Sequence, residues 1–135
     1  MPYVEGPMAA AFALTCRSTR QRSWCTRAET LADRTARRFP KLTMGPQYDS
    51  LYIRALLELY ALDGKPRWYD VARAAVDRAM ARAGDSHGLY LRTWGGRPIG
   101  TIGTDPDKLQ THAATTSAIA WLAAARPPGA AGTGP

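Results

Sequence analysis

Aromatic rings, charged groups and an imidazole lie at expected helix starts, one turn further into an expected helix, and in an expected long loop of this chain. The residues concerned are Tyr3, Glu5, Tyr48, Asp49, Arg54, Tyr90, Trp94 and His112. A sugar suits such a mixture, because its C–H faces stack on apolar rings while its hydroxyl groups need directional hydrogen-bond partners. These eight side chains are therefore the predicted ligand contacts.

Two pairs of carboxylates are candidates for acid–base chemistry. Glu5 and Asp49 lie in corresponding first turns of two expected helices, and Asp105 and Asp107 open the last expected helix. Two neighbouring carboxyl groups can divide the work when one keeps its proton as an acid and the other stays ionised. For Glu5 and Asp49, catalysis, ligand hydrogen bonding and helix capping stay open as alternatives. Asp105 and Asp107 are interpreted as helix caps.

Histidines and cysteines give a weaker signal. His112 either contacts a ligand or is structural, and His87, in a turn of glycine, aspartate and serine, is expected to be exposed. A zinc site needs three or four ligands at usable spacing, which two histidines and two distant cysteines do not offer. No metal or other cofactor is predicted. Cys16 and Cys25 flank a turn where a disulfide is geometrically possible. We favour two buried thiols, because Cys16 corresponds to the expected core residue Tyr60 in the repeat described below.

The stretch from Gln47 to Ala83 predicts a helical hairpin. Residues 48–60 are apolar or aromatic nearly all round a helical wheel, the pattern of a helix that is enclosed on every side. Residues 63–66 end this helix, since glycine suits the left-handed position after a helix and proline cannot continue a helix interior. From Trp68 onward, apolar residues recur every three or four positions opposite a charged face, which predicts a half-exposed helix.

The same pattern occurs 44 positions earlier, where Trp24 corresponds to Trp68. An apolar helix over residues 8–15 and a half-exposed helix over residues 24–39 are therefore expected to form an earlier hairpin of the same kind. The two tryptophans are expected to pack at the hairpin turns.

The last part of the chain predicts a long loop and a third apolar helix. Residues 84–103 are rich in glycine and too many for a plain connector, which suggests a functional loop. Within this loop, residues 89–94 are expected to be extended or to form a short strand. Asp105-Pro106 supplies a helix cap and first position, and residues 109–125 form the helix.

The predicted fold class is all-α, with helical hairpins of the kind that build layered toroids. About five helices are expected, and the family resemblance given below implies that they are part of an incomplete (α/α)6 toroid or barrel. Residues 1–126 form this partial barrel domain and residues 127–135 a disordered tail. If apolar helices form an inner ring, they run parallel and begin at one rim, where the predicted ligand contacts would share one opening.

Charge and hydropathy limit the partners. The net charge of +7 comes mostly from arginine, because only three of the eighteen basic residues are lysine. These arginines alternate with acidic residues on the half-exposed helices, which predicts a solvated face and ranks nucleic-acid binding last. The sequence contains no run of eighteen apolar residues, so no membrane span is predicted. Glu5 stands where a signal peptide would be basic, so the chain is expected to be either intracellular or preceded by an upstream N-terminus.

Five segments, in their order and spacing, resemble the C-terminal part of the endo-α-1,6-mannanase glycoside hydrolases (family 76). The segments are Tyr3-Val4-Glu5-Gly6, Tyr48-Asp49-Ser50-Leu51-Tyr52-Ile53-Arg54, Asp63-Gly64-Lys65-Pro66-Arg67-Trp68, Gly88-Leu89-Tyr90-Leu91-Arg92 and Leu109-Gln110-Thr111-His112-Ala113-Ala114. The resemblance implies a six-hairpin barrel longer than this chain, which hydrolyses α-1,6-linked mannose polymers.

The resemblance also implies an adjacent Asp-Asp pair as acid and nucleophile, and this chain contains no Asp-Asp. The chain is therefore expected to supply barrel wall and part of a sugar-binding mouth for a mannan-like substrate, without a catalytic residue and with little or no activity alone. Self-association through exposed apolar helix flanks is a further expectation. The alternative is a helical-repeat protein-interaction module, which a continuous apolar inner face would favour.

Overall fold

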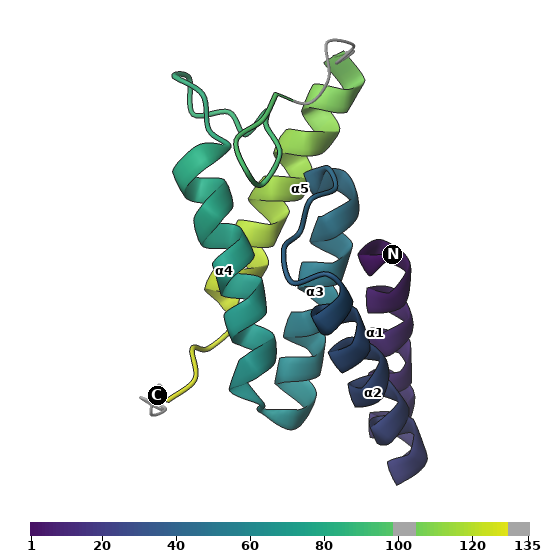
Figure 1. Ribbon diagram of the computed structural model, residues 1–135. Helices are drawn as coiled ribbons and strands as arrows, with labels where there is room; N and C mark the ends of the chain where they lie inside the picture. Colours follow the sequence, from purple (N-terminus) through teal and green to yellow (C-terminus); the bar gives the residue numbers. More distant parts are fainter. Residues whose placement is uncertain (99–104, 130–135) are drawn as a thin grey trace.

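The computed structural model describes residues 1–98 and 105–129, apart from the side chains of residues 105 and 106. Its five packed helices are α1 (Pro2–Thr19), α2 (Arg22–Arg38), α3 (Pro46–Asp63), α4 (Pro66–Arg82) and α5 (Asp105–Ala124) (Figure 1). The described residues form no sheet, only isolated bridges of Gly84 with Tyr90 and of Arg92 with Pro98. The all-α prediction is confirmed, and the short strand considered for residues 89–94 is not formed. Most of the predicted tail, residues 130–135, lies outside the described residues.

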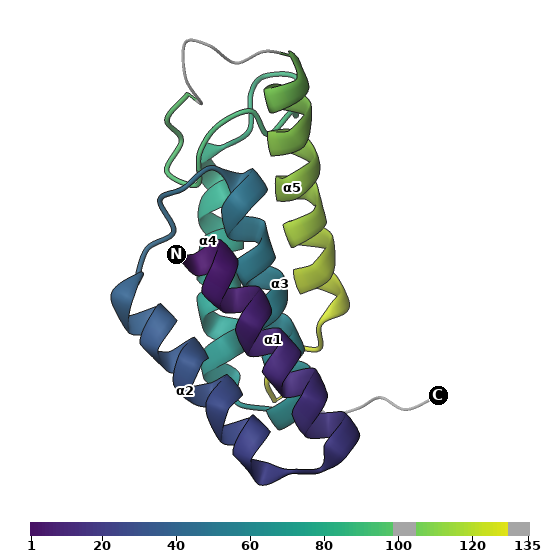
Figure 2. The ribbon, with the colours of Figure 1, turned by 90° about the vertical axis from the view of Figure 1, so that its right-hand side faces the viewer.

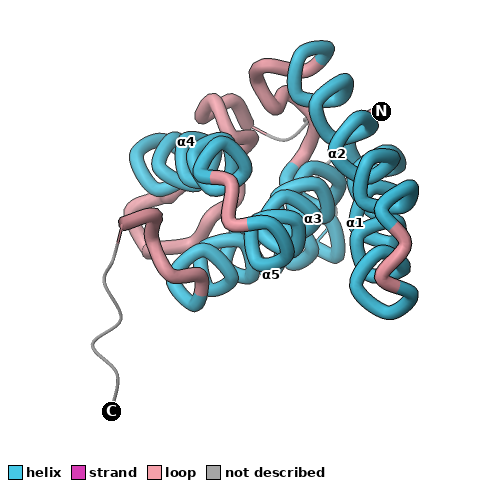
Figure 3. The backbone as a smooth tube through the Cα atoms, turned by 90° about the horizontal axis from the view of Figure 1, so that it is seen from below, coloured by secondary structure: helices cyan, strands magenta, loops and turns pink. Residues whose placement is uncertain are grey.

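The helices form two layers. Figures 1 and 2 show α1, α3 and α5 running in one direction, and α2 and α4 running in the opposite direction. Along the helix axes in Figure 3, α3 lies between α1 and α5, and α2 and α4 pack on one side of this row. We call α1, α3 and α5 the inner layer and α2 and α4 the outer layer. The parallel inner helices are as predicted, whereas five helices do not by themselves show a closed toroid.

The predicted repeat is present at every boundary of the first two hairpins. The boundaries of α1 and α2 recur 44 positions later in α3 and α4, as Pro2 and Pro46, Thr19 and Asp63, Arg22 and Pro66, and Arg38 and Arg82. Buried residues recur at the same spacing, as Ala9 and Ile53, Ala28 and Ala72, Ala32 and Val76, and Thr35 and Ala79. Each hairpin therefore turns equivalent faces toward its neighbours.

The first helix is longer than predicted, because it includes two residues that usually interrupt helices. Gly6 and Pro7 both lie within α1, which begins at Pro2. Gly6 lets α1 approach α3 closely, since a Cβ atom there would lie 2.8 Å from Cδ2 and 3.0 Å from Cα of Tyr52. This contact accounts for a glycine in a helix interior, where it otherwise costs about 1 kcal/mol relative to alanine.

The core lies between α3 and the helices around it. Its largest fully buried side chains are Tyr52, Ile53, Leu56, Leu59, Trp68, Val76 and Trp94. The prediction that residues 48–60 form a helix enclosed on every side is wrong, because Tyr48 is 45% exposed and Leu51 44%. On α1, Leu14 is 52% exposed. The inner layer is covered by the outer layer on one side, and apolar side chains remain exposed elsewhere on α1 and α3.

The hairpin turns follow the predicted chemistry. Gly64 has a φ of 68° and ends α3 in the left-handed conformation, which glycine adopts without a steric cost. Arg20 ends α1 in the same way with a φ of 56°. Trp68 is 1% exposed and its indole N–H donates to Asp63 Oδ2 at 3.0 Å. The packing role predicted for Trp68 at its turn is confirmed.

Ion pairs join the first hairpin to the second. Lys65, in the turn before α4, pairs with Glu29 of α2, and Arg67 Nη1 lies 3.0 Å from Asp33 Oδ1. These contacts fix the start of α4 against α2. The arginines predicted to form a solvated face are exposed, apart from the partly buried Arg78; the exposed residues are Arg27, Arg34, Arg37, Arg38, Arg73 and Arg82.

Cys16 and Cys25 form a disulfide across the turn between α1 and α2. The prediction of two buried thiols is therefore wrong, although Cys16 is buried as expected, at 7% exposure. The short turn brings the two Cα atoms to 5.1 Å, within the range that a disulfide spans. The repeat aligns Cys16 with Tyr60 and so identified Cys16 as a core position. It did not show that Cys25 lies opposite Cys16 across the turn.

Candidate functional site

The starts of α1 and α3 bring two predicted contact residues together. The rings of Tyr3 and Tyr48 lie 5.3 Å apart between centroids and are tilted by 47°. Tyr48 is 45% exposed, whereas Tyr3 is partly buried. Parallel inner helices place these first turns side by side, as the repeat predicted. The exposed Tyr48 ring is available to a ligand.

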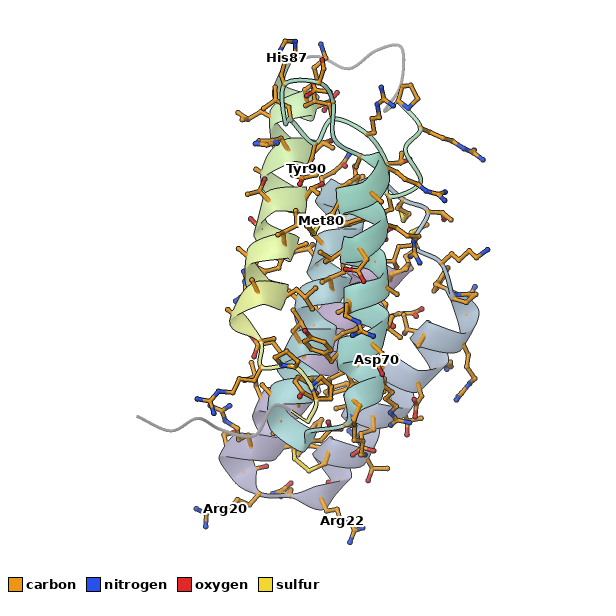
Figure 4. The ribbon with its side chains drawn as sticks, turned by 90° about the vertical axis from the view of Figure 1, so that its left-hand side faces the viewer. Arg20, Arg22, Asp70, Met80, His87 and Tyr90 are labelled. Atoms are coloured by element: carbon orange, nitrogen blue, oxygen red, sulfur yellow. A yellow bond between two sulfur atoms is a disulfide. The ribbon has the colours of Figure 1, made fainter. Side chains whose placement is uncertain are left out.

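A second pair joins the long loop to α5. The backbone N–H of Tyr90 donates to His112 Nδ1 at 3.1 Å, and the two rings stack with centroids 6.1 Å apart. Because Nδ1 accepts this bond, the neutral imidazole carries its proton on Nε2. His112 therefore has a structural role in anchoring the loop, and both rings are partly buried. Figure 4 labels Tyr90 and His87 in this loop, and His87 is exposed as predicted.

Asp49 and Trp94 lie beneath the surface. Asp49 is fully buried, its Oδ2 accepts from the Met44 backbone N–H at 3.0 Å, and its Oδ1 has no hydrogen-bond partner. Burial raises the pKa of Asp49 from 3.8 to about 6, opposed by the Met44 bond and by the nearby indole N–H of Trp94. That indole N–H makes no hydrogen bond of normal geometry.

This burial corrects the roles predicted for two residues. Trp94 is only 1% exposed, so it offers no ring face for a sugar. Asp49 is equally inaccessible and can neither contact a ligand nor attack one while the core is intact. The loop position of Trp94 suggested exposure, but the loop folds back so that its indole fills the core.

Glu5, which corresponds to Asp49 in the repeat, has different surroundings. Thr35 Oγ1 donates to Glu5 Oε2 at 2.7 Å, and this bond is the main reason that the pKa of Glu5 lies below its usual value. Glu5 and Asp49 are thus held by separate partners and do not form a hydrogen-bonded acid–base pair. The Glu5 bond ties α1 to α2, which is a packing role.

Arg54 belongs to a different place, on the side of the inner layer between α3 and α5. Its Nε lies 3.9 Å from Glu58 Oε1, and its guanidinium lies over the ring of Trp121 at 5.5 Å from the centroid. These three side chains border a hollow of about 280 Å³ whose remaining lining is Leu57, Ala61, Ala124 and Ala125. A partly exposed aromatic ring here lies beside one cation and one carboxylate.

Trp121 was not among the predicted contacts. Residues 109–125 are apolar with little amphipathic pattern, so the sequence did not show which side of this helix is open. A tryptophan in an inner helix was the available signal. The arrangement around it became visible only once α3 and α5 were placed side by side.

A second hollow lies between α1 and α3 on the other side of Arg54. It also measures about 280 Å³, and Arg54 and Glu58 border it together with Pro7, Ala10, Ala11, Leu14, Leu51 and Ala55. Most of this lining is apolar. Arg54 and Glu58 therefore form a charged ridge that separates an aromatic hollow from an aliphatic one.

The eight predicted contacts thus take part in separate local contacts. They form the pairs Tyr3 with Tyr48, Tyr90 with His112 and Asp49 with Trp94, while Glu5 contacts Thr35 and Arg54 contacts Glu58 and Trp121. Of these eight residues, Tyr48 and Arg54 are the ones classed as exposed. The side chain of Asp105, of the other predicted carboxylate pair, lies outside the described residues.

Two further features are defined for the described part of the chain. It contains no group of three or more histidine, cysteine, aspartate or glutamate side chains placed to hold a metal ion. No helix in residues 1–98 and 105–129 carries the continuous apolar stretch that a bilayer crossing requires.

Comparisons of this chain with models of protein families, with functionally characterised proteins and with solved structures find no match.

Proposed function

We propose that this chain is the C-terminal segment of a glycoside hydrolase that acts on an α-mannan-type polysaccharide, where it supplies barrel wall and part of the sugar-binding surface. The parallel inner helices and the hairpin repeat support a place in an (α/α)6 toroid, since stacking such units side by side builds a curved array. The motif resemblance supplies the substrate class.

The observation that carries this proposal is the hollow between α3 and α5. Trp121 offers a ring for the C–H face of a sugar, and Arg54 and Glu58 offer a donor and an acceptor for its hydroxyl groups. The hollow lies on the inner layer, which would line the interior of a closed toroid. Tyr48, at the start of α3, adds an exposed ring at the rim.

The same hollow explains why the chain should be inactive alone. Among the described residues, Glu58 is the only carboxylate in the lining of either hollow beside Arg54. Glycoside hydrolysis uses two carboxyl groups, one as acid and one as nucleophile or base. We therefore expect the purified chain to release no reducing sugar from α-mannan, and measurable release would contradict this assignment of roles.

Binding can be tested by calorimetric titration with linear α-1,6-linked mannooligosaccharides. Trp121→Ala and Arg54→Ala are each expected to weaken binding, with about a tenfold loss for the ring. Trp24→Ala is a matched control, because Trp24 is also partly exposed with an arginine, Arg27, 4.8 Å from its ring centroid, but lies on α2. A wild-type chain that binds no such sugar, or equal losses in Trp24→Ala and Trp121→Ala, would contradict the proposal.

A second candidate function, a helical-repeat interaction module, is favoured by the hollow between α1 and α3. Its small and apolar lining suits the apolar side of an amphipathic helix from another protein. Leu51→Glu should abolish capture of such a helix and leave sugar binding unchanged, whereas Trp121→Ala should do the reverse. Capture that survives Leu51→Glu would remove this candidate.

A further inference from the structure

The side of the molecule formed by α4 and α5 carries a hollow that neither proposed function uses. It measures about 390 Å³, and its lining includes Arg73, Val76, Asp77 and Met80 of α4 with Ile119 and Leu122 of α5. We call these six residues the α4–α5 face. Figure 4 views α4 and α5 side by side and labels Asp70 and Met80 on α4. Met80 borders this hollow and is 56% exposed.

The hairpin repeat shows what kind of surface this is. Arg73 and Asp77 correspond, 44 positions on, to Glu29 and Asp33 of α2. Glu29 and Asp33 are not free, because they form ion pairs with Lys65 and Arg67 at the turn of the second hairpin, where α4 begins. The equivalent surface of the first hairpin is therefore a contact surface between packed units. On α4, the corresponding Arg73 and Asp77 are exposed and contact no later hairpin among the described residues.

The charges of the α4–α5 face indicate its occupant. Arg73 Nη2 lies 3.7 Å from Asp70 Oδ1 within α4, and its side chain is 56% exposed. Asp77 is also exposed and takes part in no ion pair among the described residues. Two copies of α4 that cross in antiparallel fashion near Ala75 bring Arg73 of each opposite Asp77 of the other. The same crossing places each Met80 toward the Tyr69 end of the opposite hollow, where a flexible side chain can fill an irregular gap.

We propose that the α4–α5 face binds the same face of a second copy of this chain, forming a two-fold symmetric dimer. The contact is isologous, so the two Arg73–Asp77 pairs form together near the two-fold axis, beside Met80, Ile119 and Leu122 of each copy. Complementary charges fix the antiparallel direction of the two α4 helices, and burial of the apolar residues supplies most of the affinity. The hollow beside Trp121 lies between α3 and α5 and stays open in this dimer, so the proposal does not depend on sugar binding.

Charge reversal at Arg73 and Asp77 tests the dimer, because two single variants that each fail to dimerise should still associate with each other. In Arg73→Asp, the introduced carboxylate would face Asp77 of the other copy, and in Asp77→Arg two arginines would face each other. Sedimentation equilibrium over a concentration series should show a dimer for the wild type and at least tenfold weaker association for each single variant. An equimolar mixture of the two variants, and the double variant R73D/D77R, should restore dimerisation, because opposite charges then meet across the contact.

Arg37→Asp controls for net charge, since Arg37 is exposed on α2 and outside this face. It should leave dimerisation unchanged, and circular dichroism should show the same helical content for every variant. A wild type that stays monomeric at all concentrations would overturn the proposal. So would single variants that dimerise like the wild type, or a mixture that fails to associate, because each result excludes this symmetric contact.

Discussion

Glu5 and Asp49 occupy corresponding positions in the repeat, but their pKa values shift in opposite directions because their surroundings differ. Glu5 receives the hydroxyl of Thr35, which favours its ionised form and lowers its pKa. Asp49 is fully buried and keeps one oxygen unpartnered, so its protonated form is favoured. The repeat predicts where these residues lie, and the local partners decide what their carboxyl groups do.

The raised pKa of Asp49 predicts that ionisation of this residue costs stability. The folded state holds the proton up to about pH 6, whereas the unfolded chain releases it near 3.8. The stability contributed by this group is therefore fully present below about pH 4 and falls as the pH rises through 6. Asp49→Asn should be more stable than the wild type at pH 7.5, by on the order of 2 kcal/mol, and equally stable near pH 4.

Urea denaturation of both proteins between pH 4 and 8 measures this difference. The pKa values of Glu5 and Asp85 are lowered, so their contributions to stability fall as the pH becomes acidic in both proteins. Subtracting one profile from the other removes these shared contributions. The amide of the Asp49→Asn variant keeps an oxygen that can accept from the Met44 N–H, so the bond seen at 3.0 Å in the wild type can be retained. A difference that does not change with pH would show that Asp49 is not the group responsible.

At the scale of the helices, the two hairpin turns share a conformation but not a residue. Arg20 has a φ of 56° where Gly64 has 68°. A side chain in the left-handed region costs about 1 kcal/mol. Glycine removes this cost but regains only part of it as stability, because its unfolded state is more flexible. Arg20→Gly should raise the free energy of unfolding by about 0.5 kcal/mol, and Gly64→Ala should lower it by about 1 kcal/mol. Thermal unfolding of both variants checks these signs, and a stabilising Gly64→Ala would contradict the assignment.

The disulfide should stabilise the first hairpin by restricting the unfolded chain. Cys16 and Cys25 are separated by 9 positions, and a loop of this length corresponds to about 2 to 3 kcal/mol. Adding a reductant should lower the free energy of unfolding of the wild type, measured by urea denaturation, by this amount. The double variant C16S/C25S should show the lower stability with or without reductant. Equal stability of the oxidised and reduced wild type would contradict this prediction.

The number and direction of the helices followed from the sequence, because apolar periodicity and turn residues are local signals. The spacing of Trp24 and Trp68 located both hairpins, and Gly64 and Pro66 located a turn. Contacts between segments far apart did not follow. Trp94 looked exposed because its neighbours are glycines, yet it fills the core, and Cys25 lies opposite Cys16 because of how α1 meets α2.

At the scale of the whole molecule, the sequence could not show which face of the inner layer stays open. The helices α1, α3 and α5 are apolar around most of their circumference, and the outer layer covers one side of them. Exposed Leu14 and Leu51 and the partly exposed Trp121 mark what remains uncovered. Arg54 was the predicted contact that identified this side, since a charged residue in an apolar helix has to reach solvent or a partner. The candidate site is therefore the hollow beside Arg54, whereas the sequence predicted a site at the rim.

Sugar contact at Trp121 can be observed directly through the indole N–H signals of the four tryptophans. Trp68 and Trp94 are buried, Trp24 is on α2, and Trp121 borders the inner hollow. In ¹H–¹⁵N spectra recorded while an α-1,6-linked mannooligosaccharide is added, the Trp121 signal should move and saturate while the other three stay in place. A stationary Trp121 signal, or four signals that move together, would contradict a carbohydrate site on the inner layer.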